Sequence, residues 1–150
     1  MYPPASQASQ DERLLAAVAH CAALLPFVGV IVPLYIWLTQ QDWSKFVRFH
    51  AIQALIHQIV MPAATLAVYL LGIWGLYGTL MGGLSGGSQG ALPSGMLALR
   101  CTLVSIVLGS WGLTITLGLL GVSRTLAGRD FLYPLVGRWL VSHIDGDKVS

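Results

Sequence analysis

The charged residues of the chain are grouped, and they leave three long stretches without any charge. Asp, Glu, Lys and Arg are absent from residues 14–41, 49–99 and 101–123. Each stretch is mostly apolar and long enough for a transmembrane helix, which needs roughly 20 such residues. The pattern predicts an all-α integral membrane protein with three transmembrane helices in residues 14–123, between a polar N-terminal tail (residues 1–13) and a polar C-terminal tail (residues 124–150).

The first predicted span, about residues 14–38, is interrupted by Pro26 and Pro33. Each proline removes a helix hydrogen bond, so we expect a kink or a break there. A kinked helix would still cross the membrane. A break would give a hairpin of two half-helices that protein must cover, because lipid cannot satisfy exposed backbone groups. The hairpin would also bring the N-terminus to the same side as the loop at residues 40–45.

The second predicted span is too long to cross a bilayer upright. Residues 46–81 stay apolar, and about 36 helical residues would cover roughly 54 Å against a hydrocarbon core of about 30 Å. We therefore expect this helix to start in the interface and to bend near Pro62. A glycine-rich, uncharged loop follows at residues 82–95.

The third predicted span, about residues 97–122, has small residues on one face. Ser105, Gly109, Gly112 and Thr116 recur every three or four residues, which is the spacing that lets two membrane helices approach closely. Two uses fit this face: packing within the chain, or packing against a partner subunit.

The C-terminal tail contains a short amphipathic segment. Pro134 can open a helix at its first position. The apolar residues of this helix would form an arc opposite Arg138 and Ser142, and they are Leu135, Val136, Trp139, Leu140 and Ile144. The pattern predicts a helix that lies in the membrane interface rather than across the membrane.

Composition agrees with a membrane protein. The chain is 55% hydrophobic and 9% charged, with a mean hydropathy of +0.73, whereas soluble domains carry about 25% charged residues. The net charge of +2 is too small and too scattered to indicate binding to nucleic acid.

The positive charges predict the orientation in the membrane. Most Lys and Arg residues fall in the first loop and the C-terminal tail: Lys45, Arg48, Arg124, Arg129, Arg138 and Lys148. The positive-inside rule then puts the loop at residues 40–45 and the C-terminus in the cytoplasm. With three spans, the N-terminus and the glycine-rich loop would lie on the opposite side of a plasma membrane.

A polar stripe enters the second span. His50, Gln53 and His57 share one helix face, and polar groups at membrane depth are costly unless they face protein, water or a cofactor. The stripe fits hydrogen bonding to neighbouring helices, binding of a partner or passenger segment, or ligation of a pigment by His57. Two histidines two turns apart cannot by themselves close a metal site.

His20 is a second candidate ligand. It lies among alanines, and small neighbours would let a flat macrocycle approach a neutral imidazole. A hydrogen bond between helices is the alternative. No cofactor is predicted by the sequence beyond this pigment hypothesis.

Catalysis is not indicated. No Asp or Glu lies in a predicted span, which disfavours intramembrane aspartyl proteolysis and carboxylate proton relays. The zinc-protease motif H-E-x-x-H and the hydrolase motif G-x-S-x-G are absent from the sequence. We predict no enzymatic activity.

The sequence S-K-F-V-R-F-H-A-I-Q-A-L at Ser44–Leu55 resembles the signature of the Tic-Twenty-like membrane proteins. The matching residues are Lys45, Phe46, Val47, Arg48, Phe49, His50, Ala51, Gln53 and Ala54. The tail G-R-D-F-L-Y-P, with Gly128, Tyr133 and Pro134, is similar to the ending of that family, and V-P-L-Y-I-W-L at Val32–Leu38 is a weaker match. The resemblance implies a bacterial protein of unknown function related to a plastid import subunit, which has one more span than predicted here.

Three functional hypotheses follow. The first is a non-enzymatic accessory or scaffold subunit of a larger membrane complex, with the lipid bilayer and other membrane proteins as its partners. The second is an oligomeric transport or protein-translocation component, which rests on the resemblance and the polar stripe. The third is a pigment-binding subunit that uses His20 or His57.

Overall fold

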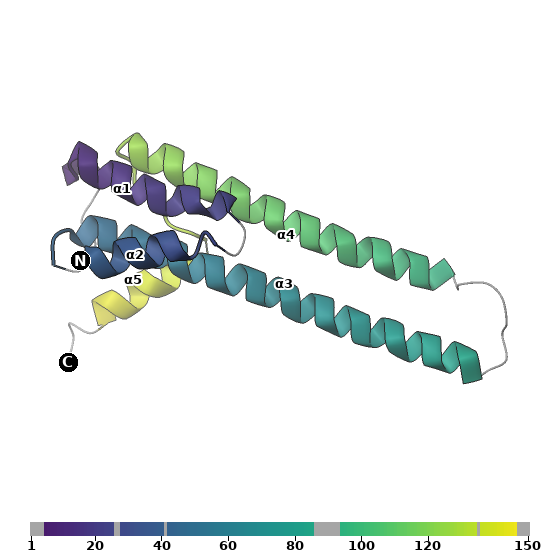
Figure 1. Cartoon of the computed structure of the whole chain (residues 1–150). Coiled ribbons are helices and arrows are strands. Elements are labelled where there is room, and N and C mark those ends of the chain that lie inside the picture. The colour runs from purple at the N-terminus through teal and green to yellow at the C-terminus, as the bar shows by residue number, and fades with distance from the viewer. Residues whose placement is uncertain (1–4, 26–27, 41, 86–93, 135, 147–150) are drawn as a thin grey trace. The chain divides into compact units, whose positions relative to one another are not determined.

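The computed structural model describes residues 5–25, 28–40, 42–85, 94–134 and 136–146. Within these ranges the chain is helical and contains no strand, so the all-α prediction is confirmed (Figure 1). The helices are α1 (Gln10–Cys21), α2 (Ile31–Thr39), α3 (Lys45–Ser85), α4 (Ser94–Leu126) and α5 (Val136–Gly146), with 3-10 turns at Ala5–Gln7 and Ala22–Leu24. The chain forms two compact units, unit 1 (Met1–Val60 and Leu113–Ser150) and unit 2 (Met61–Gly112).

In the described part of the chain, two helices are long and apolar enough to cross a membrane, so the predicted third span is not confirmed. They are the segments Lys45–Gly82 of α3 and Gly95–Leu126 of α4. The first predicted span is instead divided into α1, with 12 residues, and α2, with 9 residues. Helices of these lengths cover only about 18 Å and 14 Å, too little for a hydrocarbon core of about 30 Å.

The break in the first predicted span lies before Pro33. Leu25 is already extended, with φ −101° and ψ 99°, and α2 begins at Ile31. Pro33 falls in the first turn of α2, where its missing N–H costs no helix hydrogen bond. Gly29 closes the turn, because a Cβ there would collide with the carbonyl oxygens of Ala22 and Leu25. Pro26 lies outside the described residues.

The start of α1 lies at the same end of unit 1 as the start of α3. The hydroxyl of Ser44 donates a hydrogen bond of 2.6 Å to Glu12. Glu12 also completes a capping box with Ser9 at the N-terminus of α1. Arg13, one residue on, places its guanidinium against Gly128 at the end of α4. Since α1 and α2 pack against each other, this segment is the broken hairpin rather than the kinked span.

The hydrogen bond between Ser44 and Glu12 predicts that the contact between α1 and the start of α3 is sensitive to acid. The hydrogen bond from Ser44, followed by that from the backbone of Ser9, lowers the pKa of Glu12 from its usual 4.5. A carboxyl whose pKa is lowered by folding stabilises the fold above its unfolded pKa, and this contribution is lost as the pH falls through the folded pKa. We expect the melting temperature to drop below about pH 4.5 in the wild type, and less in Glu12→Gln. An equal drop in both, measured by circular dichroism in detergent, would contradict this assignment.

In unit 2, the second part of α3 packs beside the first part of α4. The side chain of Leu103 lies directly on Gly72, and Thr65 donates a hydrogen bond of 3.0 Å to Ser110. Large apolar residues of this unit, among them Leu71 and Trp74, are 73% and 77% exposed. Exposed apolar surface on this scale is typical of contact with lipid or with another membrane protein. Helix α3 continues through Pro62, and the bend expected there stays a prediction.

Helix α4 carries two sets of small residues, one exposed and one buried. Ser105, Gly109, Gly112 and Thr116 are exposed, and a Cβ added at either of these glycines would meet no atom within 4 Å. A second set lies on the opposite face, about 180° away at 100° per residue; it consists of Thr114, Gly118, Gly121 and Thr125, all buried. The packing of the first face within the chain therefore stays a prediction. A partner subunit on that face stays a prediction.

Candidate functional site: a buried polar cluster

The main polar feature of unit 1 is a group of five buried side chains, which we call the polar cluster. Its members are His20 from α1, His50, Gln53 and His57 from α3, and Tyr133 from the segment after α4. Their exposed fractions are 0%, 0%, 0%, 4% and 1%. The small residues of α4 make room for it, since a Cβ at Gly121 would lie 2.8–3.1 Å from ring atoms of His20.

His20 is the centre of the polar cluster. Its Nδ1 lies 3.1 Å from the hydroxyl oxygen of Tyr133, and its Nε2 lies 3.0 Å from Nδ1 of His50. Both ring nitrogens therefore have hydrogen-bond partners. A pigment could bind to His20 only if one of these hydrogen bonds were broken.

Aromatic rings enclose the imidazoles of the polar cluster. The ring of Phe131 meets His20 edge to face at 5.5 Å, and Phe46 meets His50 at 4.5 Å. Phe49 of the predicted motif contacts the His50 ring at 5.8 Å and is buried. These contacts surround the imidazoles of His20 and His50 with apolar ring surface, where hydrogen bonds to protein groups stabilise their polar atoms.

Gln53 satisfies backbone groups of the segment that follows α4. Its side-chain oxygen accepts a hydrogen bond of 3.1 Å from the N–H of Tyr133, and its side-chain nitrogen donates one of 3.5 Å to the carbonyl of Phe131. Gln53 lies eight residues into α3, about 12 Å from its start. Buried backbone groups outside a helix need such partners from the protein. Gln53 therefore holds an irregular segment against α3.

The segment is directed towards α3 by the way α4 ends. The N–H of Gly128 bonds to the carbonyl of Thr125, and the N–H of Arg129 bonds to that of Arg124, which is the Schellman arrangement. Gly128 has φ +66°, which residues with a side chain rarely adopt. The predicted tail motif thus has a structural reason: Gly128 turns the chain, and Tyr133 enters the polar cluster.

His57 completes the polar cluster on the side of α3 further from its start. Its ring stacks on that of Tyr133 with the centroids 4.1 Å apart and the planes 17° from parallel. Its Nε2 is buried and has no hydrogen-bond partner among the described residues. The hypothesis that His57 ligates a pigment stays a prediction.

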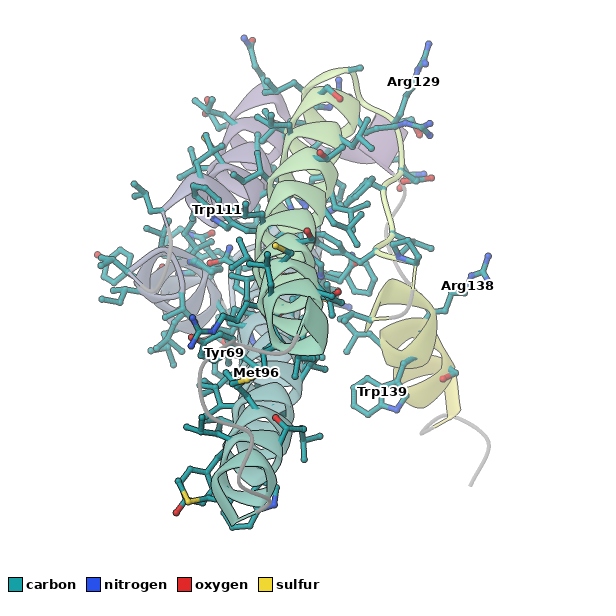
Figure 2. All side chains as sticks on the ribbon, turned by 90° about the vertical axis from the view of Figure 1, so that its right-hand side faces the viewer. Tyr69, Met96, Trp111, Arg129, Arg138 and Trp139 are labelled. Carbon is teal, nitrogen blue, oxygen red and sulfur yellow. The ribbon has the colours of Figure 1, made fainter. Side chains whose placement is uncertain are left out.

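Helix α5 returns from the polar cluster along α3. A Cβ at Gly137 would lie 2.7 Å from the side-chain oxygen of Gln53, so only glycine allows this approach. Gly137 and Leu140 are buried while Arg138 and Trp139 are exposed (Figure 2). One face of α5 is therefore covered by protein, whereas the sequence predicts that its apolar face contacts the membrane interface. Leu135 and the side chain of Ile144 lie outside the described residues.

The structure brings together residues that the sequence treats separately. His50, Gln53 and His57 share a face as expected, while Lys45 and Arg48 of the same motif are exposed. His20 and Tyr133 join them from positions 113 residues apart, which no spacing rule connects.

The chemistry of the polar cluster is that of neutral hydrogen-bonding groups. Burial raises the pKa of the Tyr133 hydroxyl well above its usual value, so the phenol keeps its proton. In the described part of the chain, no group of three His, Cys, Asp or Glu residues could hold a metal ion. The arrangement can position protons and fix the backbone, and it lacks an activated nucleophile.

The comparisons with known proteins identify the family. The model of the MamF/MmsF family, the magnetosome magnetite crystal formation protein family, matches residues 11–140. No curated protein and no solved structure matches the chain. The resemblance to the Tic-Twenty-like proteins is therefore wrong, because it rests on short motifs whereas the family model covers α1 to α4 and part of α5. With it, the support for protein translocation is lost. The chain belongs to the MamF/MmsF magnetosome magnetite crystal formation family.

Proposed function

We propose that this chain is a non-enzymatic subunit of the magnetosome membrane that contributes to magnetite crystal formation by assembling with other membrane proteins. The observation that carries the proposal is the family match over residues 11–140. The inward hydrogen bonding of the polar cluster supports it, since His20 uses both ring nitrogens inside the fold. The surfaces that would bind partners are then the exposed ones, which are the apolar faces of α3 and α4 and the charged end of unit 1.

The proposed topology has two spans and places both termini in the cytoplasm. Arg13 contacts Gly128, so this positive charge joins those of the first loop and the C-terminal tail. Seven of the eight Lys and Arg residues then belong to that side, and the remaining one is Arg100 near the start of α4. The positive-inside rule favours this orientation more strongly than it favours three spans. The glycine-rich loop would face the compartment in which the crystal grows.

The acidic residues bear on how the protein could influence the mineral. All six Asp and Glu residues lie before residue 43 or after residue 129, and the glycine-rich loop has none. Carboxylates are among the main protein ligands for iron and other hard cations. In the proposed topology the chain offers no carboxylate to the crystal, so we expect an indirect effect through the membrane assembly rather than an iron-binding template.

The proposal is tested by deleting the gene in a magnetite-forming host and restoring it with variants. We expect deletion to alter crystal size or shape, as measured by electron microscopy, and the wild-type gene to restore it. Gln53→Leu, which removes the support of the segment after α4, should fail to restore it, whereas Gln58→Leu should succeed. Crystals that are unchanged by deletion would contradict the proposal. Purified protein that binds iron as tightly as a carboxylate site would contradict the indirect mechanism.

A further inference from the structure

The hydrogen-bond chain in the polar cluster has a direction that the positions of its atoms determine. Tyr133 is 1% exposed, and its hydroxyl has one hydrogen-bond partner among the described residues, Nδ1 of His20. A buried donor without an acceptor costs more than an acceptor lone pair without a donor. The hydroxyl therefore donates its hydrogen to His20 Nδ1.

The remaining protons follow from this first one. Neutral His20, with Nδ1 accepting, carries its own hydrogen on Nε2 and donates it to Nδ1 of His50. Neutral His50 then carries its hydrogen on Nε2. The chain thus runs from Tyr133 through His20 to His50, with one hydrogen for each link.

One added proton reverses this direction. A protonated His50 has hydrogens on both ring nitrogens, so its Nδ1 becomes a donor towards His20. His20 must then accept at Nε2 and carry its hydrogen on Nδ1, where it faces the Tyr133 oxygen. The hydrogen of the Tyr133 hydroxyl is left without an acceptor in a buried site. One proton enters and none leaves: in net, one N–H bond forms at His50 Nδ1, and the N–H bond at His20 Nε2 is exchanged for one at His20 Nδ1.

Two opposing effects act on a proton at His50. Burial of the ring opposes a positive charge on it, whereas the carboxylate of Asp130, which interacts electrostatically with His50, favours one. Among the described side chains, the other titratable members of the polar cluster are His20 from α1, His57 from α3 and Tyr133 itself. Helix α4 contributes Gly118 and Gly121 to the contacts with His20, and α5 contributes Gly137 to the contact with Gln53.

We propose that the chain Tyr133–His20–His50 is a one-proton latch, which holds the segment Phe131–Tyr133 and the start of α5 against α3 when His50 is neutral and releases them when His50 takes up a proton. The released segment includes the two backbone groups that Gln53 holds. A latch of this kind would let the exposed end of unit 1 respond to acidification. The latch stands independently of the proposed role in the membrane assembly.

The test is hydrogen exchange of the Tyr133 and Gly137 amides in the purified full chain, corrected for the intrinsic effect of pH. Both amides are hydrogen-bonded in the latched state. Because burial opposes the charged form of His50, the range must extend into acid; between about pH 8 and pH 4 we expect wild-type protection to fall by about tenfold or more, the effect of one buried donor left without an acceptor.

Matched variants separate the latch from general histidine titration. His50→Gln still offers an acceptor to His20 but cannot take up the proton, so its protection should not change with pH. Tyr133→Phe has no hydroxyl hydrogen that could be left without an acceptor, so its protection should not fall with pH either. His57 lies outside the hydrogen-bond chain, so protection in His57→Gln should still fall. Protection that stays constant with pH in the wild type, or that falls in His50→Gln as much as in the wild type, would overturn the proposal. If His50→Gln does not fold, an equal fall of protection in Tyr133→Phe would overturn it.

Discussion

Gln53→Leu is expected to cause one of the largest losses of stability of any single substitution in unit 1. Leucine is close to glutamine in volume but leaves the buried N–H of Tyr133 and the carbonyl of Phe131 without their partner. An unpaired buried backbone group costs about 1–3 kcal/mol, and the longer bond contributes less, so we expect a loss of about 2–3 kcal/mol. The measurement is unfolding in mixed detergent micelles, followed by circular dichroism.

Gln58→Leu is the matched control, since it makes the same change on the same helix. Gln58 is half-buried and donates one bond of 3.5 Å to the carbonyl of Ala19. Because this carbonyl is near the end of α1 and the bond is at the limit of hydrogen-bond length, we expect a loss below about 1 kcal/mol. Equal losses in the two variants would mean that Gln53 does not support the segment after α4.

Gly121→Leu should disrupt the packing of α1 on α4. The first carbon of the new side chain would already lie 2.8–3.1 Å from ring atoms of His20, and His20 is held by two hydrogen bonds and cannot move aside freely. Overpacking of this kind costs about 1–3 kcal/mol, and displacement of His20 would add the cost of breaking the polar cluster. Thermal unfolding in detergent measures the change.

Gly109→Leu tests the same substitution on the opposite face of α4. Nothing lies within 4 Å of a Cβ there, so we expect the stability of the monomer to change by less than about 0.5 kcal/mol. A destabilisation equal to that of Gly121→Leu would contradict the assignment of the faces. A shift in oligomeric state with unchanged monomer stability would indicate that this face meets a partner subunit.

The length and charge of apolar stretches predict the two spanning helices but not the first segment. The second and third predicted spans agree with α3 and α4 to within a few residues, because a long uncharged run has few alternatives in a membrane. Residues 14–41 form such a run as well, yet they fold as a hairpin. Whether the chain turns back there depends on the packing of Gly29 and on the polar cluster that α1 joins. The length of an apolar stretch contains no information on either.

Helical spacing predicts which residues share a face, but not which face is buried. Helix α4 has two sets of small residues with similar spacing, and the choice between them depends on the contact of Gly118 and Gly121 with α1. The same helical spacing predicts that His50, Gln53 and His57 lie on one face of α3. Its partners, His20 and Tyr133, are distant in the chain, and only the fold brings them together.

Labelling of single cysteines in sealed membrane vesicles tests the two-span hairpin fold most directly. In a background with Cys21 and Cys101 replaced by serine, Ser6→Cys, Asp42→Cys and Ser88→Cys would be reacted with a membrane-impermeant maleimide. The fold places the start of α1 beside the start of α3, so Ser6→Cys and Asp42→Cys should react from the same side, and Ser88→Cys from the other. Reaction of Ser6→Cys from the same side as Ser88→Cys would mean that the first segment crosses the membrane, and it would contradict this account.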